Sequence, residues 1–186
     1  MSIVLTWDLF VIVFFTIIIA YSFIIGRNQT LKIIISTYIA ILTADGIGNI
    51  VGRYISPKVI ALFFPRMDFA TSAIVIKILI FIGVIVVLAM KGEFQVHLSD
   101  EHSKIVTLIV NGIFGILSAG LVVSTILFYT SGGSFLQLSG AITNDAILSL
   151  KRDSTLVRNL IDYYNLWFSF PAIVFAIASF LKKAEG

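Results

Sequence analysis

The sequence has 186 residues, of which 59% are hydrophobic and only 12% are charged, and its mean hydropathy is +1.05. A soluble domain usually has about a quarter of its residues charged. The excess apolar surface has to face lipid, so the chain is predicted to be a polytopic membrane protein. The net charge of +3 is divided among loops without a basic stripe, which excludes a nucleic-acid-binding protein. The absence of cysteine excludes disulfides and thiolate chemistry.

Four segments of the chain have the roughly 20 mostly apolar residues that a membrane-spanning helix needs. They cover residues 7–25, 31–50, 71–90 and 105–130. A fifth segment, residues 165–181, is shorter and contains Pro171, so it either spans the membrane or forms a re-entrant or interfacial helix. The predicted fold class is all-α: one integral membrane domain, residues 1–186, built as a transmembrane bundle of four to five spans. The first span lacks a basic leader and a cleavage site, so it is expected to be retained.

Two further helices are expected outside the spans. Ser56 and Pro57 suit the start of a short apolar helix that Pro65 ends, and this helix is expected to lie in the membrane interface. Residues 131–164 are predicted to form a loop with an amphipathic helix, because apolar residues recur there at helical spacing. The apolar positions are Leu156, Val157, Leu160, Ile161 and Tyr164. This helix is expected to pack on the membrane surface or on the bundle.

The basic residues do not by themselves fix the orientation of the spans. If five spans alternate, six lysines and arginines lie on each side of the membrane, so the positive-inside rule gives no decision. The first short loop, with Arg27 and Lys32, favours an external N-terminus.

Small residues recur at every fourth position of the second span, and we call this set the second-span ridge. Helices in lipid gain little from hydrophobic association, and such ridges allow the close backbone approach that holds helices together. The ridge is therefore predicted to be a helix-packing surface, and it ends in a GxxxG pair. It consists of Ser36, Ala40, Ala44, Gly48 and Gly52.

The fourth span has a second face of small residues, at Gly112, Gly115 and Ala119. Spans two and four are therefore expected to form the tightly packed central pair, within one chain or between two, so a homo-oligomer or a membrane partner is expected. The stretch "DGIGNIVG" superficially resembles a dinucleotide-binding fingerprint. No strand precedes it and its third glycine comes one residue late, so no nucleotide is expected to bind.

Besides Asp8 and Lys32, which stand at the very starts of their spans, two charged residues fall inside the predicted spans. Asp45 lies five residues before the end of span two, and Lys77 lies six residues after the start of span three. Because consecutive spans run antiparallel, both lie at a similar depth near one face of the membrane. Charges within a membrane are costly and usually pair or line a wet cavity. We therefore expect an ion pair between Asp45 and Lys77, with Asp8 and Asn49 completing a polar cluster. Alternatively, Lys77 snorkels to the interface and Asp45 meets headgroup water.

Other chemistry is not indicated. The stretch "HLSDEH", residues 97–102, has metal-ligand residue types but misses the H-x-x-E-H pattern by one position, so it reads as a solvated loop. No nucleophile elbow, H-E-x-x-H or Walker A motif is present. The sequence predicts no enzyme, cofactor or metal site.

The order of these features resembles the CvpA family, the colicin V production proteins of bacterial inner membranes. An aspartate heads the first span in "WDLFVIVFF", and a turn with glycine and arginine leads into the second span in "IIGRNQTLKIIISTYIA". A polar loop with an aspartate precedes a glycine-rich fourth span in "LSDEHSKIVTLIVNGIFGILSAGLVVSTILF". A serine-led amphipathic stretch follows in "RDSTLVRNLIDYY". The order Gly26–Arg27 and the apolar segment after Leu166 depart from the family pattern.

The resemblance implies a bacterial inner-membrane protein with an external N-terminus and a role in envelope homeostasis or export-related processes, such as toxin production. It implies no catalytic residues. We expect the chain to act by helix packing with itself or with a membrane partner. The alternative is a channel or transporter that uses Asp8, Asp45 and Lys77.

Overall fold

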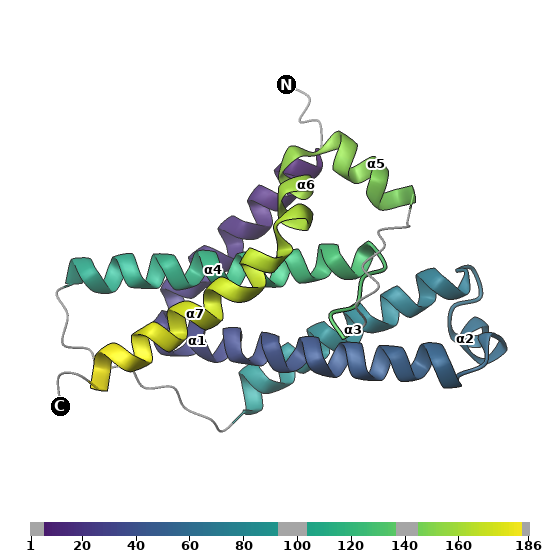
Figure 1. The fold of residues 1–186 in the computed structure, drawn as a ribbon, viewed down its shortest axis with the longest axis horizontal. Coiled ribbons are helices and arrows are strands. Elements are labelled where there is room, and N and C mark those ends of the chain that lie inside the picture. The colour runs from purple at the N-terminus through teal and green to yellow at the C-terminus, as the bar shows by residue number, and fades with distance from the viewer. Residues whose placement is uncertain (1–5, 93–103, 137–144, 184–186) are drawn as a thin grey trace.

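The computed structural model describes residues 6–92, 104–136 and 145–183. This part of the chain is helical and contains no strand, which confirms the all-α fold class (Figure 1). The helices are α1 (Trp7–Tyr54), α2 (Pro57–Phe63), α3 (Phe69–Lys91), α4 (Lys104–Thr130), α5 (Asp145–Asp153), α6 (Thr155–Asp162) and α7 (Tyr164–Lys183).

The first two predicted spans are the two halves of one broken helix, α1. Its 48 residues would extend about 72 Å at 1.5 Å per residue, roughly twice the thickness of a bilayer core. Gly26 interrupts it with φ 78° and ψ 173°, values that a residue with a side chain rarely adopts. The two halves, residues 7–25 and 27–54, therefore run in different directions (Figure 1). The chain thus turns between the first two predicted spans at a single residue, Gly26.

Hydrogen bonds at the break show how sharply the chain turns. The Thr30 hydroxyl donates to the carbonyl of Gly26 at 2.9 Å and also lies 3.5 Å from the carbonyl of Ser22, eight residues back. In a straight helix residues eight apart are separated by roughly 12 Å. Ser22 and Thr30 are both buried, so the turn is packed inside the bundle.

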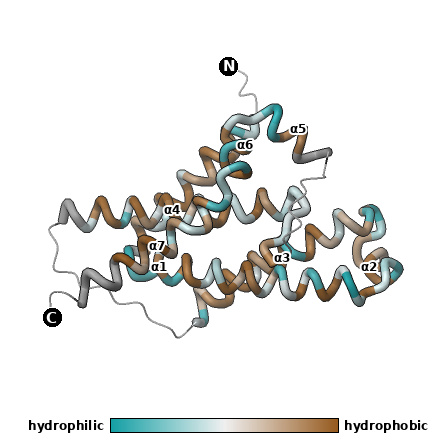
Figure 2. The backbone as a smooth tube through the Cα atoms, viewed as in Figure 1, coloured by the Kyte–Doolittle hydropathy of each residue, from teal (hydrophilic) through white to brown (hydrophobic). Residues whose placement is uncertain are grey.

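Within the described residues, three helices, α1, α3 and α4, are long and apolar enough to cross a membrane. The bent pair of α6 and α7, which meet at 63°, raises the number to four if the pair counts as one span. Because α1 has the length of two spans, α1, α3 and α4 together provide four spans. The pair of α6 and α7 provides a fifth if it crosses the membrane, which agrees with the predicted bundle of four to five spans. The chain is a membrane protein, and apolar residues run along all its long helices (Figure 2).

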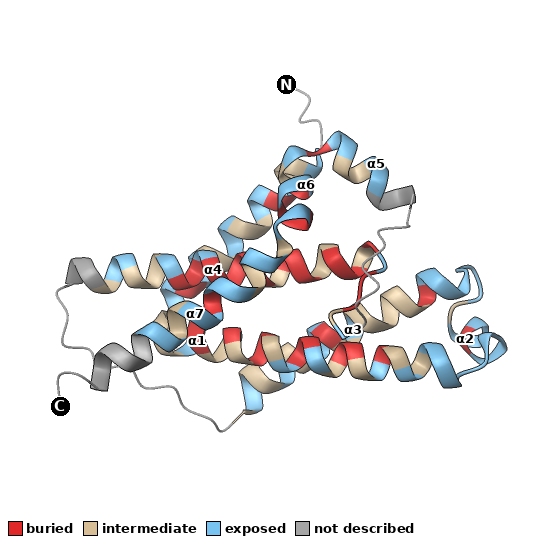
Figure 3. Ribbon diagram, viewed as in Figure 1, coloured by how far each residue is buried: buried red, intermediate tan, exposed pale blue. Residues whose placement is uncertain are grey.

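The core lies where the second half of α1, α3 and α4 meet. Its largest fully buried side chains are Tyr129 and Phe81, whose rings pack edge to face at 5.9 Å. Ile34 and Ile41 from α1 and Leu121 from α4 complete the contact. Much of the surface of α3 and of the first half of α1 remains exposed (Figure 3), as expected for helices that face lipid, whereas α4 is largely buried.

The amphipathic helix predicted within residues 131–164 is α6. Val157, Leu160 and Ile161 are buried against Val11 of α1 and Val123 of α4. The charged and amide side chains on the opposite face are exposed: Arg158, Asn159 and Asp162. Of the two expected locations, α6 therefore occupies the one on the bundle.

The short helix predicted after Ser56 is α2, which begins at Pro57 and ends at Phe63. Ser56 is its N-cap residue by position but makes no capping hydrogen bond with its side chain. Only Ile60 is buried, and the rest of α2 is exposed (Figure 3). The expected place of this helix in the membrane interface stays a prediction.

The α7 helix continues through Pro171, where a hydroxyl group from another helix hydrogen-bonds to its backbone. Proline has no N–H and disturbs the preceding turn. The Tyr38 hydroxyl, from the second half of α1, donates to the carbonyl of Phe168 at 2.5 Å and accepts from the amide of Ala172 at 3.2 Å. Phe168 and Ala172 are four residues apart, so the hydroxyl stands between the two groups of a normal helical hydrogen bond. Tyr38 thus ties α7 to α1.

Candidate functional site

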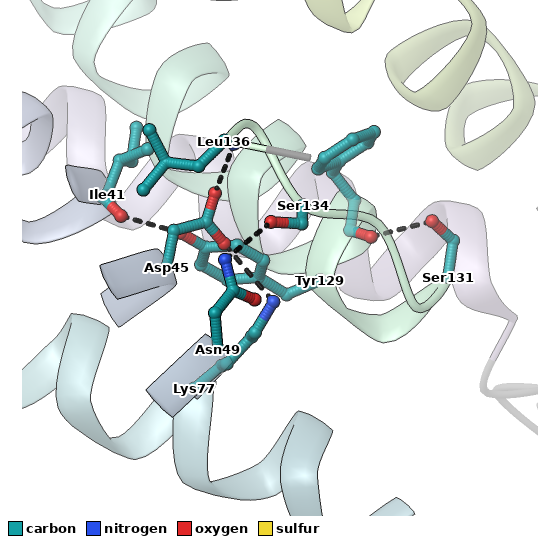
Figure 4. Close-up of polar contacts among 9 residues, drawn as sticks. Ile41, Asp45, Asn49, Lys77, Tyr129, Ser131, Ser134 and Leu136 are labelled. Atoms are coloured by element: carbon teal, nitrogen blue, oxygen red, sulfur yellow. Dashed lines mark hydrogen bonds and ion pairs between the residues drawn. The ribbon is translucent and has the colours of Figure 1, made fainter. Parts of the chain in front are cut away.

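The charged residues of spans two and three meet in one polar cluster, shown in Figure 4. Asp45, on the second half of α1, is wholly buried. Its Oδ1 lies 3.3 Å from Nζ of Lys77 on α3, and its Oδ2 accepts a hydrogen bond from the amide of Leu136 at 3.0 Å. The expected ion pair is therefore present, and both carboxylate oxygens have partners. This accords with the general rule that buried charges are paired and hydrogen-bonded.

Lys77 reaches Asp45 along the face of an aromatic ring. Its Nζ lies 5.8 Å from the centroid of the Tyr129 ring, within the range of a cation–π interaction. The Tyr129 hydroxyl donates to the carbonyl of Ile41 at 3.1 Å, which fixes the ring between α4 and α1. The Lys77 side chain is only 12% exposed, so it does not snorkel out to the interface.

Gly48 makes the space through which Lys77 passes. A Cβ atom at Gly48 would lie 2.4 Å from Cγ of Lys77 and 2.7 Å from its Cε. Such distances are too short for carbon atoms, so any side chain at this position would displace the lysine. The absence of a side chain at Gly48 is thus part of the ion-pair geometry.

The segment after α4 covers the cluster from the other side (Figure 4). Gly132 adopts φ 82°, which turns the chain back from the helix end. Asn49, one turn after Asp45, donates from Nδ2 to Oγ of Ser134 at 3.4 Å. Asn49 therefore takes the place expected for it beside the ion pair, and together with Leu136 it holds this segment against α1.

A cleft of about 530 Å³ opens beside the cluster, between the start of α3 and the end of α4. Lys77 and Tyr129 line its inner end, and Asp68 and Thr71 line its rim. Asp68 caps α3 and accepts hydrogen bonds from the hydroxyl of Thr71 at 2.6 Å and from its amide at 3.1 Å. These bonds, chiefly the one from the hydroxyl, lower the pKa of Asp68 and keep a negative charge at the rim.

Asp8 does not join the cluster, so that part of the prediction is wrong. Its Oδ1 accepts hydrogen bonds from the Ser154 hydroxyl at 2.5 Å and from the amide of Leu156 at 3.1 Å. The prediction compared only the depths at which Asp8, Asp45 and Lys77 lie in the membrane. At that depth α6 begins directly beside Asp8, and the first amides of a helix need acceptors. Ser154 also accepts from the amide of Val157 at 3.0 Å, so Asp8 and Ser154 together cap α6.

The second-span ridge packs within the chain. Ser36, Ala40, Ala44 and Gly48 are buried, whereas Gly52 is exposed and a Cβ there would meet no atom within 4 Å. Gly48 contacts the Lys77 side chain of α3, so at that position the ridge accommodates a lysine instead of a helix backbone. A ridge that is buried in this way is not free for a second copy of the chain.

The small residues of α4 pack mainly against the first span, not the second. A Cβ at Gly115 would lie 3.1 Å from Cβ of Ser22, and one at Gly112 would lie 3.5 Å from the Phe23 ring. Ala119 is fully buried. The α4 helix also meets the second half of α1 in the core, where Leu121 clusters with Ile34 and the Tyr129 hydroxyl donates to the carbonyl of Ile41. Spans two and four therefore do meet in the core, as expected, but the face of Gly112 and Gly115 contacts the first half of α1, because the turn at Gly26 brings that half against α4.

The "HLSDEH" stretch lies outside the described residues. Among the residues that are described, no group of three or more His, Cys, Asp or Glu side chains could hold a metal ion. No protein-family model matches the chain, and no curated protein or solved structure is significantly similar to it.

Several residues of this site carry no sequence signal. Tyr129 is an ordinary aromatic residue of an apolar segment, and Leu136 contributes only its backbone amide. Ser154 is the exception, because a serine directly before an amphipathic run is a typical N-cap.

Proposed function

We propose that this chain is a bacterial inner-membrane protein of the CvpA type, with its N-terminus outside, that acts in envelope homeostasis or export-related processes. In this proposal it works by packing against another membrane helix, from a second copy or from a membrane partner. The sequence resemblance supports the process, and the structure suggests which face is available.

The observation that carries the proposal is the open face of α3. Only Ser72 and Phe81 of this 23-residue helix are buried. The opposite side is a continuous exposed stripe with helical spacing, and a Cβ at Gly83 in its middle would meet nothing within 4 Å. A small residue flanked by apolar ones allows a partner helix to approach closely in lipid. The stripe consists of Leu79, Ile82, Gly83, Val86, Val87 and Met90.

Cross-linking can test this face cleanly because the chain contains no cysteine. Gly83→Cys should form a disulfide-linked or reagent-linked adduct in native membranes, whereas Ser72→Cys, on the buried side of the same helix, should not. If cysteines at Gly83, Ile82 and Val86 all fail to form an adduct in membranes where the protein accumulates, α3 faces lipid alone. The proposed mode of action is then wrong.

A test in cells addresses the process. Deletion of the gene should make the bacterium more permeable to an envelope-impermeant dye or impair export of a secreted toxin. The wild-type chain should restore the phenotype, and Gly83→Leu should not, although it inserts normally. If Gly83→Leu fully restores the phenotype, the envelope role does not require the α3 face.

A second candidate function, conduction of an ion or a polar solute, is favoured by one specific observation. The cleft between α3 and α4 reaches Lys77, which lies directly in front of the buried Asp45. An ion pair at the end of a polar opening could exchange partners with a permeating ion. Proteoliposomes with the wild-type chain should then show ion flux that Asp45→Asn abolishes. Equal ion flux in liposomes with and without the protein would eliminate this candidate function.

A further inference from the structure

A groove of about 570 Å³ lies between the first half of α1 and the bend where α6 meets α7. Its walls include Phe15 from α1, Leu160 from α6 and Phe170 from α7. Its volume falls within the roughly 300–1,000 Å³ of sites that hold a single small ligand. It lies on the opposite half of α1 from Asp45 and is separate from the polar cluster.

The groove is built into the packing of the helices. Trp167 of α7 forms part of its wall, with its ring edge-on to Phe15 at 6.1 Å. Behind the groove, Trp167 presses against Gly120 of α4 so closely that a Cβ at Gly120 would lie 1.9 Å from Cε3 of the indole. Gly120 thus lets the indole sit deep enough to leave the groove open.

Polar groups are confined to a few positions of the lining. Asn159 lies on α6, on the face that also exposes Arg158 and Asp162, and Tyr163 is the C-cap residue of this helix. The remaining polar residue, Thr16, donates its hydroxyl to the carbonyl of Ile12 in its own helix at 2.8 Å. The groove therefore has polar groups at Asn159 and Tyr163 and a mostly apolar lining elsewhere, a pattern that suits an amphiphile.

We propose that this groove binds one acyl chain of a membrane phospholipid, with the ester and headgroup end at Asn159 and Tyr163. The rim residues Ile12, Leu166 and Phe170 are exposed, so the groove is continuous with the apolar surface that faces the bilayer. A lipid chain reaches it from the bilayer without crossing water. The inference requires only membrane insertion and does not depend on the α3 face or on the proposed process.

Trp167 provides the probe, because the chain has only two tryptophans. Trp7→Phe leaves Trp167 as the sole fluorophore in the groove. Trp167→Phe leaves Trp7, which is 48% exposed and does not line the groove, as a reference for bulk lipid. Each protein, in detergent micelles, is titrated with a phosphatidylcholine whose acyl chains carry bromine, which quenches indole fluorescence on contact. Trp167 should be half-quenched at a lipid fraction roughly tenfold lower than Trp7, as a specific site requires.

A matched pair of variants locates the binding in the groove. In the Trp7→Phe background, Thr16→Phe places a ring in the groove from an exposed position and should remove the tenfold preference. Val13→Phe, on the same helix, is exposed but does not line the groove and should keep the preference. Equal quenching of Trp167 and Trp7, or an unchanged preference in Thr16→Phe, would show that the groove holds bulk lipid or detergent only, and would overturn the proposal.

Discussion

The side chain of Lys77 lies across Gly48, and a single methyl group at Gly48 would collide with it at 2.4 Å. The lysine needs this path to reach the carboxylate of Asp45 on the same helix as the glycine. A glycine that the sequence presents as part of a helix-contact motif thus serves an ion pair between two spans.

Gly48→Ala should therefore destabilise the protein. The added methyl group forces Lys77 off its path, and overpacking of this kind typically costs about 1–3 kcal/mol. Gly46→Ala is the matched control, because a Cβ there meets nothing within 4 Å and alanine favours the helix. Thermal unfolding in detergent measures both variants. Equal unfolding temperatures for the two would contradict the collision at Lys77.

Tyr38→Phe should loosen α7 at Pro171. The change keeps the ring, which packs edge to face on Phe168 at 5.2 Å, but removes the hydroxyl between Phe168 and Ala172. Two backbone groups in an apolar setting then lack partners, at a cost of about 1–3 kcal/mol. Hydrogen exchange at Ala172 should accelerate, whereas Tyr54→Phe, at an exposed tyrosine, should leave it unchanged. Unaltered exchange in Tyr38→Phe would show that the helix closes without the hydroxyl.

Gly26→Ala tests the break in α1. A Cβ at Gly26 would meet no atom within 4 Å, so only the backbone conformation opposes the substitution. A residue with a side chain in this region costs of order 1–3 kcal/mol. Gly83→Ala, at an equally open position inside a regular helix, should not destabilise the protein. If Gly26→Ala unfolds at the wild-type temperature, α1 does not turn at this residue.

Asp8→Ala should destabilise α6 selectively. The substitution removes the acceptor for Ser154 and Leu156, and loss of a helix cap costs about 0.5–2 kcal/mol. Amide exchange of residues 155–162 should accelerate while that of α3 stays constant. Ser154→Ala should act on the same helix, and the double variant should be little worse than the more severe single variant. Additive losses would mean that Asp8 and Ser154 act independently.

The sequence predicts local features of this fold well because they depend on spacing alone. The α3 helix, Phe69–Lys91, differs from the predicted span 71–90 by one or two residues, and α6 buries three of its predicted apolar residues. The ion pair was predictable because antiparallel spans place residues at comparable depths. Depth, however, leaves open which neighbour a side chain meets.

The predictions that the structure corrects all concern which neighbouring helix a side chain meets. Asp8 pairs with Ser154, 146 residues away, because α6 packs beside the start of α1. The faces of Gly112 and Gly115 meet the first half of α1 because the chain turns at Gly26. A small-residue pattern shows where something can approach closely, but not whether the neighbour is a helix backbone, a lysine or an indole.

The most direct test of the account is a double-mutant cycle on Asp45 and Lys77, measured by unfolding in detergent. Asp45→Asn leaves Lys77 without its partner, and Lys77→Met leaves a buried carboxylate unpaired, so each should lose about 3–5 kcal/mol. The double variant buries neither charge, and its loss should not exceed that of the worse single variant. A double variant whose loss equals the sum of the two single losses would contradict the ion pair.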